Sequence, residues 1–132
     1  FTDQFYHTDN DTMDKVSQET LKNVGTGALA SALTLMNANT STAEQVLENI
    51  VNAAENRLQI EYELSVESIQ HGGDFKDEKA ILNAWEDWYS KTMQTVTDLE
   101  HRPTKELQDK IATAQNKLKT KVKQQLEGLN KL

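Results

Sequence analysis

Apolar residues recur at helical spacing along most of the chain, and short polar breaks interrupt them. Spacings of three and four residues place side chains on one face of an α-helix, because the helix turns once in about 3.6 residues. Four such stretches follow one another. The pattern therefore predicts four long helices, at about residues 12–36, 43–70, 77–100 and 104–129.

Residues that start and stop helices support these limits. Ser41 or Thr42 would cap the second helix, and Asp74 or Asp77 the third. His71-Gly72-Gly73 is typical of a helix that ends at glycine, and Arg102-Pro103-Thr104 of a new helix start. Because the helices have matched lengths and short connections, each is expected to run antiparallel to the one before it. We therefore predict an all-α single domain over residues 1–132, an up-down-up-down four-helix bundle.

The N-terminal quarter of the chain fits this pattern least well. Gly25 and Gly27 each cost about 1 kcal/mol relative to alanine inside a helix, so a kink or break is expected near them. Residues 1–10 are polar apart from three aromatic side chains. They predict an extended aromatic arm before the first helix.

Composition removes several other classes of protein. Five glycines and one proline are too few for the many turns of a β-sandwich or barrel. The absence of cysteine excludes disulfides, thiolate metal sites and a cysteine nucleophile. A net charge of −7 disfavours attraction to nucleic acid. No apolar run approaches the roughly 18 residues of a membrane span. We therefore expect no nucleic-acid partner and no membrane span.

The net charge conceals an uneven distribution. Residues 1–100 hold 6 Lys and Arg against 18 Asp and Glu, a net charge of −12, whereas residues 101–132 hold 8 against 3, a net charge of +5. A basic last helix beside acidic neighbours would have a complementary field within the fold. The alternative is a basic strip for an anionic partner. Complementarity within the fold is the interpretation we favour.

Motifs that would indicate catalysis or a cofactor do not fit their structural context. Gly25-Thr-Gly27-Ala-Leu-Ala30 has the letters of a dinucleotide-binding turn, but that turn follows a strand, and helix is predicted here. The histidines, His7, His71 and His101, lie in the arm or at predicted helix ends, and no Gly-x-Ser-x-Gly elbow or pair of Glu-x-x-His motifs occurs. We predict a non-enzymatic protein with no catalytic residue, metal or cofactor.

The second predicted helix carries more apolar side chains than one core stripe needs. Its main stripe includes Leu47, Ala54 and Leu58. An outer stripe runs beside it, and the two stripes cover about 200° of the helix, where a surface helix shows little more than 100°. Either the helix contacts two neighbours in the bundle, or the outer stripe meets a second copy, a partner protein or a lipid-like ligand. The candidate binding residues of this outer stripe are Val46, Ile50, Ile60 and Leu64.

Aromatic residues supply the other candidates for partner binding. Trp85 falls in the middle of the core stripe of the third helix, whereas Trp88 falls at its edge, with one side of the indole exposed to water. Edge aromatics serve as interface anchors or as ordinary bundle rims. On the arm, Phe1, Phe5 and Tyr6 either fold into the bundle end or bind a partner.

Two features favour a location outside the cytoplasm. The chain begins at Phe1 rather than at methionine, as a chain does after removal of a signal peptide or after trimming. Two N-x-S/T sequences occur, at Asn10 and at Asn39, and such sequences accept glycans in secreted proteins. We expect a secreted or otherwise extracytoplasmic protein with candidate glycosylation sites at these two asparagines.

These observations together favour a secreted helical-bundle protein that binds another protein and inhibits or modulates it, for example an extracellular protease or a defence complex. One alternative is a carrier of a small apolar ligand held between the helices, favoured by the small residues of the first helix and by Met36 and Met93. Another is the extracytoplasmic sensing domain of a membrane receptor. Self-association through the outer stripe of the second helix is a further expectation.

Overall fold

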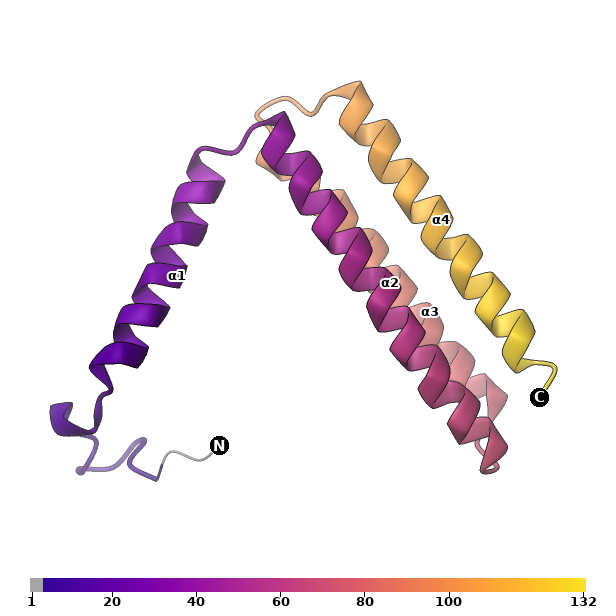
Figure 1. Ribbon diagram of the computed structural model, residues 1–132, viewed down its shortest axis with the longest axis horizontal. Coiled ribbons are helices and arrows are strands. Elements are labelled where there is room, and N and C mark those ends of the chain that lie inside the picture. The colour runs from indigo at the N-terminus through magenta and orange to yellow at the C-terminus, as the bar shows by residue number, and fades with distance from the viewer. Residues whose placement is uncertain (1–3) are drawn as a thin grey trace. The chain divides into compact units, whose positions relative to one another are not determined.

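The computed structural model describes residues 4–132, and its regular segments are all helical (Figure 1). The prediction of an all-α chain with four long helices is confirmed. Two short 3-10 helices, η1 and η2, accompany the four α-helices. The elements are η1 (Met13–Lys15), α1 (Gln18–Met36), α2 (Thr40–Gln70), α3 (Phe75–Thr95), η2 (Val96–Leu99) and α4 (Lys105–Leu129).

The chain divides into two compact units, Phe1–Asn37 and Ala38–Leu132. The first unit holds η1 and α1, and the second holds α2, α3, η2 and α4. In the second unit the three long helices pack side by side in alternating directions (Figure 1). Bundle packing with short antiparallel connections is therefore found among α2, α3 and α4.

The second unit is built around one aliphatic core to which each of its helices contributes a stripe. Leu47, Ala54 and Leu58 of the predicted α2 stripe are all buried. Burial of a large aliphatic side chain contributes about 1.5–3 kcal/mol, so this core accounts for the cohesion of the three helices. Its buried apolar members are Ala43, Leu47, Ala54, Leu58, Leu82, Met93, Val96, Leu107, Ile111, Leu118, Val122 and Leu129.

Polar side chains fix how these helices are aligned. Ser65 Oγ donates to Glu78 Oε2 at 2.7 Å between α2 and α3. The buried Gln125 Nε2 donates to the carbonyl oxygen of Leu58 at 3.0 Å between α4 and α2. Each bond is made in a partly or fully buried setting, where a lost partner would leave a costly unpaired group. Sliding one helix along another is therefore disfavoured.

Side-chain caps define where the helices of the second unit begin. An N-cap side chain accepts a hydrogen bond from an N–H group that the first turn leaves unpaired. Of the two predicted caps, Asp74 and Asp77, it is Asp74 that caps α3, so that helix begins at Phe75 rather than at residue 77. The prediction of Ser41 or Thr42 as the α2 cap is wrong, because Asn39 Oδ1 accepts from Thr42 N at 3.1 Å and the helix starts at Thr40.

The predicted glycine termination of α2 is confirmed. Gly72 has φ +91°, in the left-handed region that glycine enters without a Cβ clash. The amide N–H of Gly73 then donates to the carbonyl oxygen of Ser68 at 2.8 Å. A Cβ atom at Gly73 would lie 2.2 Å from Ser68 Oγ. Both glycines are thus required by the turn that leads from α2 into α3.

The ends of α3 and α4 differ in how closely they follow the sequence pattern. The predicted third helix, residues 77–100, is α-helical only to Thr95 and continues as the 3-10 helix η2. Val96 of η2 is still buried in the core, which explains why the apolar pattern extends past the α-helix. Thr104 caps α4, which begins at Lys105, one residue after the predicted start, and ends at Leu129 as predicted.

In the first unit, α1 is shorter than predicted and is continuous. It begins at Gln18 rather than near residue 12, because Ser17 Oγ accepts from Thr20 N at 3.2 Å and caps it there. It then runs through Gly25 and Gly27 to Met36. The predicted break is therefore wrong, because two glycines lower helix propensity without removing any backbone hydrogen-bond donor.

The segment before α1 is turned rather than extended over the described part of the predicted arm, residues 4–10. Thr8 N donates to the carbonyl oxygen of Phe5 at 3.0 Å, and Asp11 N to that of Thr8 at 3.1 Å. His7 has φ +59°, so the chain reverses locally. The prediction of an extended arm is wrong for these residues, and Phe1 lies outside the described part of the chain.

Candidate functional site

Trp88 occupies the edge position that the sequence predicts for it. Its side chain on α3 is 54% exposed, so one side of the indole is open to solvent. The ring meets Tyr89 edge-on with centroids 4.7 Å apart, and Trp85 edge-on with centroids 6.0 Å apart. Edge-to-face contacts of this kind fix ring orientation. Trp88 is therefore held in place while half of it remains accessible.

Trp85 lies deeper and links the aromatic group to α2. It is half-buried and packs against the core, in agreement with its predicted core position. The guanidinium carbon of Arg57 lies 4.2 Å from the centroid of the Trp85 ring, a cation–π contact. Arg57 Nη2 also bonds Glu61 Oε1 at 2.6 Å, and Glu61 is 8% exposed. The ion pair positions the guanidinium over the ring.

These side chains enclose a surface hollow of about 640 Å³ that opens to solvent. Its size falls in the range of roughly 300–1,000 Å³ that is common for binding pockets. Aromatic rings form most of its wall, with one cation at its edge. Such a hollow can seat an apolar or aromatic group. The residues that line it, here called the Trp88 hollow, are Arg57, Ala84, Trp85, Trp88 and Tyr89.

The structure divides the predicted outer stripe of α2 into two parts. Val46 and Ile50 are half-buried and pack against the core, so this part serves the bundle. Ile60 is 49% exposed and Leu64 is 53% exposed. Positions three and seven after Arg57 lie on the same helix face as Arg57. Ile60 and Leu64 therefore extend apolar surface away from the Trp88 hollow along α2.

One exposed face of α3 is also apolar. Ile81, Ala84 and Trp88 follow helical spacing and are all exposed, and two of them line the Trp88 hollow. The exposed part of the α2 stripe and this face of α3 belong to the two helices that line the hollow. We call the following residues the α2–α3 patch: Ile60, Leu64, Ile81, Ala84 and Trp88.

The described arm aromatics belong to the first unit and are grouped with residues of that unit. The ammonium of Lys15 lies 5.3 Å from the centroid of the half-buried Phe5 ring. Tyr6 is exposed and stacks on His7 with centroids 4.0 Å apart. These contacts organise the turn that precedes α1.

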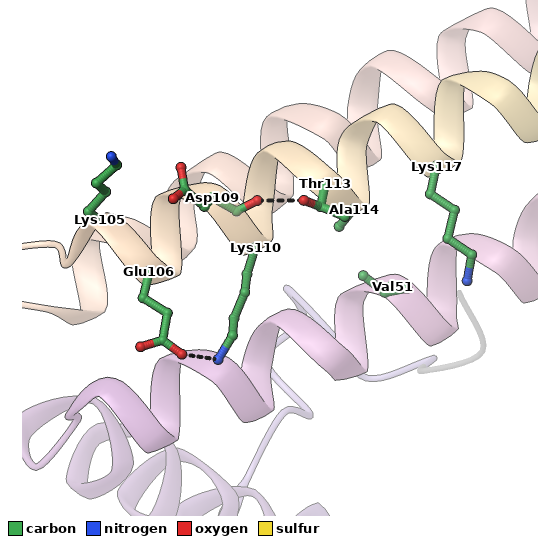
Figure 2. Close-up of a pocket in the computed structure, with 8 residues that line it drawn as sticks. All are labelled: Val51, Lys105, Glu106, Asp109, Lys110, Thr113, Ala114 and Lys117. Atoms are coloured by element: carbon green, nitrogen blue, oxygen red, sulfur yellow. Dashed lines mark hydrogen bonds and ion pairs between the residues drawn. The ribbon is translucent and has the colours of Figure 1, made fainter.

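A second hollow, of about 600 Å³, lies between α2 and α4 and has a charged rim (Figure 2). Lys110 Nζ bonds Glu44 Oε1 at 2.6 Å and Glu106 Oε1 at 2.9 Å. These carboxylates raise the pKa of Lys110 above its usual value. The lining residues, with Val51 and Ala114 as its apolar part, are Val51, Lys105, Glu106, Asp109, Lys110, Thr113, Ala114 and Lys117.

The charges of α2 and α4 compensate each other across this second hollow. Lys117 Nζ bonds Glu55 Oε1 at 2.7 Å and holds the pKa of that carboxyl below its usual value. Lys121 Nζ donates to the backbone oxygen of Glu55 at 3.1 Å. The predicted complementarity of the basic last helix with an acidic neighbour is confirmed. Because Lys110 and Lys117 already have carboxylate partners, the hollow is a poor site for an anion.

The candidate glycosylation sites and His71 lie outside the two hollows. Asn10 and Asn39 are both exposed, as glycan acceptors must be. Of the histidines, His71 has its Nδ1 2.8 Å from the carbonyl oxygen of Glu67. An N–H donated to this carbonyl completes the end of α2. Among residues 4–132, no group of three or more His, Asp or Glu side chains is arranged to hold a metal ion.

Within the same residues, every helix is too short or too polar to cross a membrane. Comparisons of the chain with models of known protein families, with curated proteins and with solved structures find no match.

Arg57, Ala84 and Tyr89 line the Trp88 hollow but were not among the candidates predicted from the sequence, and Arg57 is the charged residue of the three. Its ion pair with Glu61 has the i,i+4 spacing of a helix pair and is visible in the sequence. Its position over Trp85 depends on how α2 and α3 are aligned, which the helical pattern of each alone does not define. The polar bond between Ser65 and Glu78 supplies that alignment.

Proposed function

We propose that this chain is a non-enzymatic binding protein that seats an apolar or aromatic side chain of another protein in the Trp88 hollow. The observation that carries the proposal is a tryptophan that is half exposed yet held by two ring contacts beside a fixed Arg57–Trp85 pair. Tryptophan, tyrosine and arginine are the residues that most often dominate binding energy at protein interfaces. All three line this one hollow.

The surroundings of the hollow support contact with a protein rather than with a small molecule alone. The α2–α3 patch adds exposed apolar side chains on two packed helices outside the hollow, and exposed apolar surface of this kind supports an interaction site. The backbone of a surface formed by packed helices is expected to move little when a partner binds. The mode of action would be occlusion: the patch covers a surface of the partner and thereby inhibits or modulates it, in a secreted setting.

The proposal can be tested by panning a random peptide library displayed on phage against the whole protein. Selected peptides should carry an aromatic or large aliphatic anchor. Trp88→Ala should weaken their binding by about 2 kcal/mol, roughly thirtyfold, as expected for an interface anchor. Because Trp88 is half exposed, its urea unfolding midpoint should change little. Binding is measured by isothermal titration of the synthetic peptides.

Two variants provide matched controls. Lys91→Ala removes an exposed side chain of α3 that lies outside the Trp88 hollow and should leave peptide binding unchanged. Ile60→Asp places a charge in the α2–α3 patch and should reduce binding while the protein stays folded. The proposal is wrong if Trp88→Ala binds the peptides normally, or if it loses stability as a core substitution does.

A further inference from the structure

A long uncharged segment distinguishes α1 from the helices of the second unit. From Asn23 to Ala43 the sequence has no Asp, Glu, Lys or Arg over 21 consecutive residues. Glu19 and Lys22 carry the charges of α1, and both lie in its first two turns. The helix is thus electrically neutral over most of its length, which is unusual for a helix that only faces water.

The apolar side chains of α1 are exposed and occupy one arc, which also holds the charged Lys22 in the first two turns. At about 100° per residue, its large apolar side chains and two alanines cover roughly half of the helix circumference. The large side chains are 50–81% exposed. The opposite face carries small polar residues. The large apolar residues of the arc are Leu21, Val24, Leu29, Leu33, Leu35 and Met36.

Two hydroxyls on the opposite face are bonded within the helix. Ser31 Oγ donates to the carbonyl oxygen of Gly27 at 2.9 Å, and Thr34 Oγ1 to that of Ala30 at 2.9 Å. Hydroxyls bonded back to the preceding turn need no water partner. The cost of bringing this face close to hydrocarbon is correspondingly low.

The length of the helix determines whether it could span a bilayer or would lie at its surface. The uncharged part within α1, residues 23–36, measures about 21 Å at 1.5 Å per residue. The hydrocarbon core of a bilayer is about 30 Å thick. A helix of this length with one apolar face lies in the plane of the interface, with its apolar arc toward the acyl chains.

We propose that α1 binds the surface of a neutral, loosely packed lipid bilayer and inserts its apolar arc among the acyl chains. A polar face of serine, threonine and asparagine has no attraction for anionic headgroups, so binding depends on apolar burial and on gaps between lipids. A second copy of α1 fits less well. A two-stranded coiled coil uses a narrow stripe of two positions in seven and would leave Leu29 and Leu33 uncovered.

The experiment is flotation of the whole protein with vesicles of unsaturated phosphatidylcholine, either small and sonicated or large and extruded. The bound fraction should be several times greater on the small vesicles, whose curvature opens gaps between lipids. It should change little with salt or with added phosphatidylserine. A chain that does not float with the small vesicles, or floats only with anionic ones, would overturn the proposal.

Substitutions at two neighbouring positions test whether lipid binding depends on the apolar arc in particular or on α1 as a whole. Leu33→Asp places a charge in the arc and should lower the bound fraction about tenfold or more. Thr34→Asp introduces the same charge on the opposite face and should lower it far less. Equal losses in both variants would contradict an oriented helix.

Sedimentation of the protein without lipid measures its oligomeric state and tests the alternative that a second copy of α1 covers the arc. A dimer that dissociates in Leu33→Asp, together with no vesicle binding by the parent chain, would assign the arc to a second copy and overturn the proposal. The fluorescence of Trp85 and Trp88 monitors folding of the second unit in every variant, so a folding defect there is not mistaken for lost lipid binding.

Discussion

The two units use helices of opposite character. In the second unit, charged residues flank each apolar stripe, and cross-helix ion pairs such as Lys117–Glu55 border a buried core. In the first unit, α1 is neutral over most of its length, and all its residues are exposed. Helical periodicity is present in both. The comparison shows that periodicity predicts a helix and its apolar face, whereas burial depends on a partner for that face.

The largest expected effect contrasts a buried leucine with an exposed one. Leu58 of α2 is fully buried, and Leu58→Ala should lower the free energy of unfolding by about 3 kcal/mol through lost burial and a residual cavity. Leu29 of α1 is 61% exposed, and Leu29→Ala should change the free energy of unfolding by less than about 0.5 kcal/mol. Urea unfolding followed by tryptophan fluorescence measures both. Similar losses in the two variants would contradict the contrast.

An intermediate effect concerns the glycines of α1. A methyl group at Gly25 or Gly27 would meet no atom within 4 Å, and alanine favours helix over glycine by about 1 kcal/mol. The double variant Gly25→Ala, Gly27→Ala should therefore increase the helicity of α1, measured by far-ultraviolet circular dichroism. The urea midpoint reported by the two tryptophans should stay the same. Reduced helicity would show that α1 needs glycine at these positions.

The smallest effect is a pH dependence confined to the second unit. Lys117 lowers the pKa of Glu55 from its usual value of 4.5. A carboxyl with a depressed folded-state pKa contributes stability above its unfolded pKa and loses it as pH falls through the folded pKa. Glu55→Gln should therefore flatten the fall in Tm below about pH 4.5, with an effect under about 1 kcal/mol for an exposed pair.

Glu127→Gln is the control for this pH effect. Glu127 is exposed and lies 3.9 Å from Lys123 on the same helix, so its removal breaks no contact between helices. The acid limb of the Tm profile should remain that of the parent chain. If both variants flatten the profile equally, general charge repulsion rather than the Glu55–Lys117 pair is responsible.

Much of the fold was predictable from the sequence because its signals are local. The α2 stripe through Leu47 and Leu58, the glycine turn at Gly72 and the α4 start at Thr104 each depend on neighbouring residues. The same holds for the exposed edge position of Trp88. These features need only the helical repeat and the chemistry of caps.

The remainder depends on alignment between segments or on competition between similar caps. Asn39 replaced Ser41 as the α2 cap because several good N-cap residues stand close together. The half-burial of Val46 and Ile50, and the position of Arg57 over Trp85, depend on how α2 is aligned with the helices packed against it. The turned conformation near Phe5 arises from hydroxyl and backbone bonds in a polar segment that has no periodicity to interpret.

The tight turn at Gly72 and Gly73 has a consequence for the order of folding. It brings Ser65 and Glu78 together across a closed loop of about a dozen residues, whereas Lys121 meets Glu55 and Gln125 meets Leu58 across separations of 66 and 67 residues. Closing the longer loop loses more chain entropy. Local contacts also form sooner than distant ones. The α2–α3 hairpin, which carries the Trp88 hollow, is therefore expected to assemble before α4 docks and completes the core.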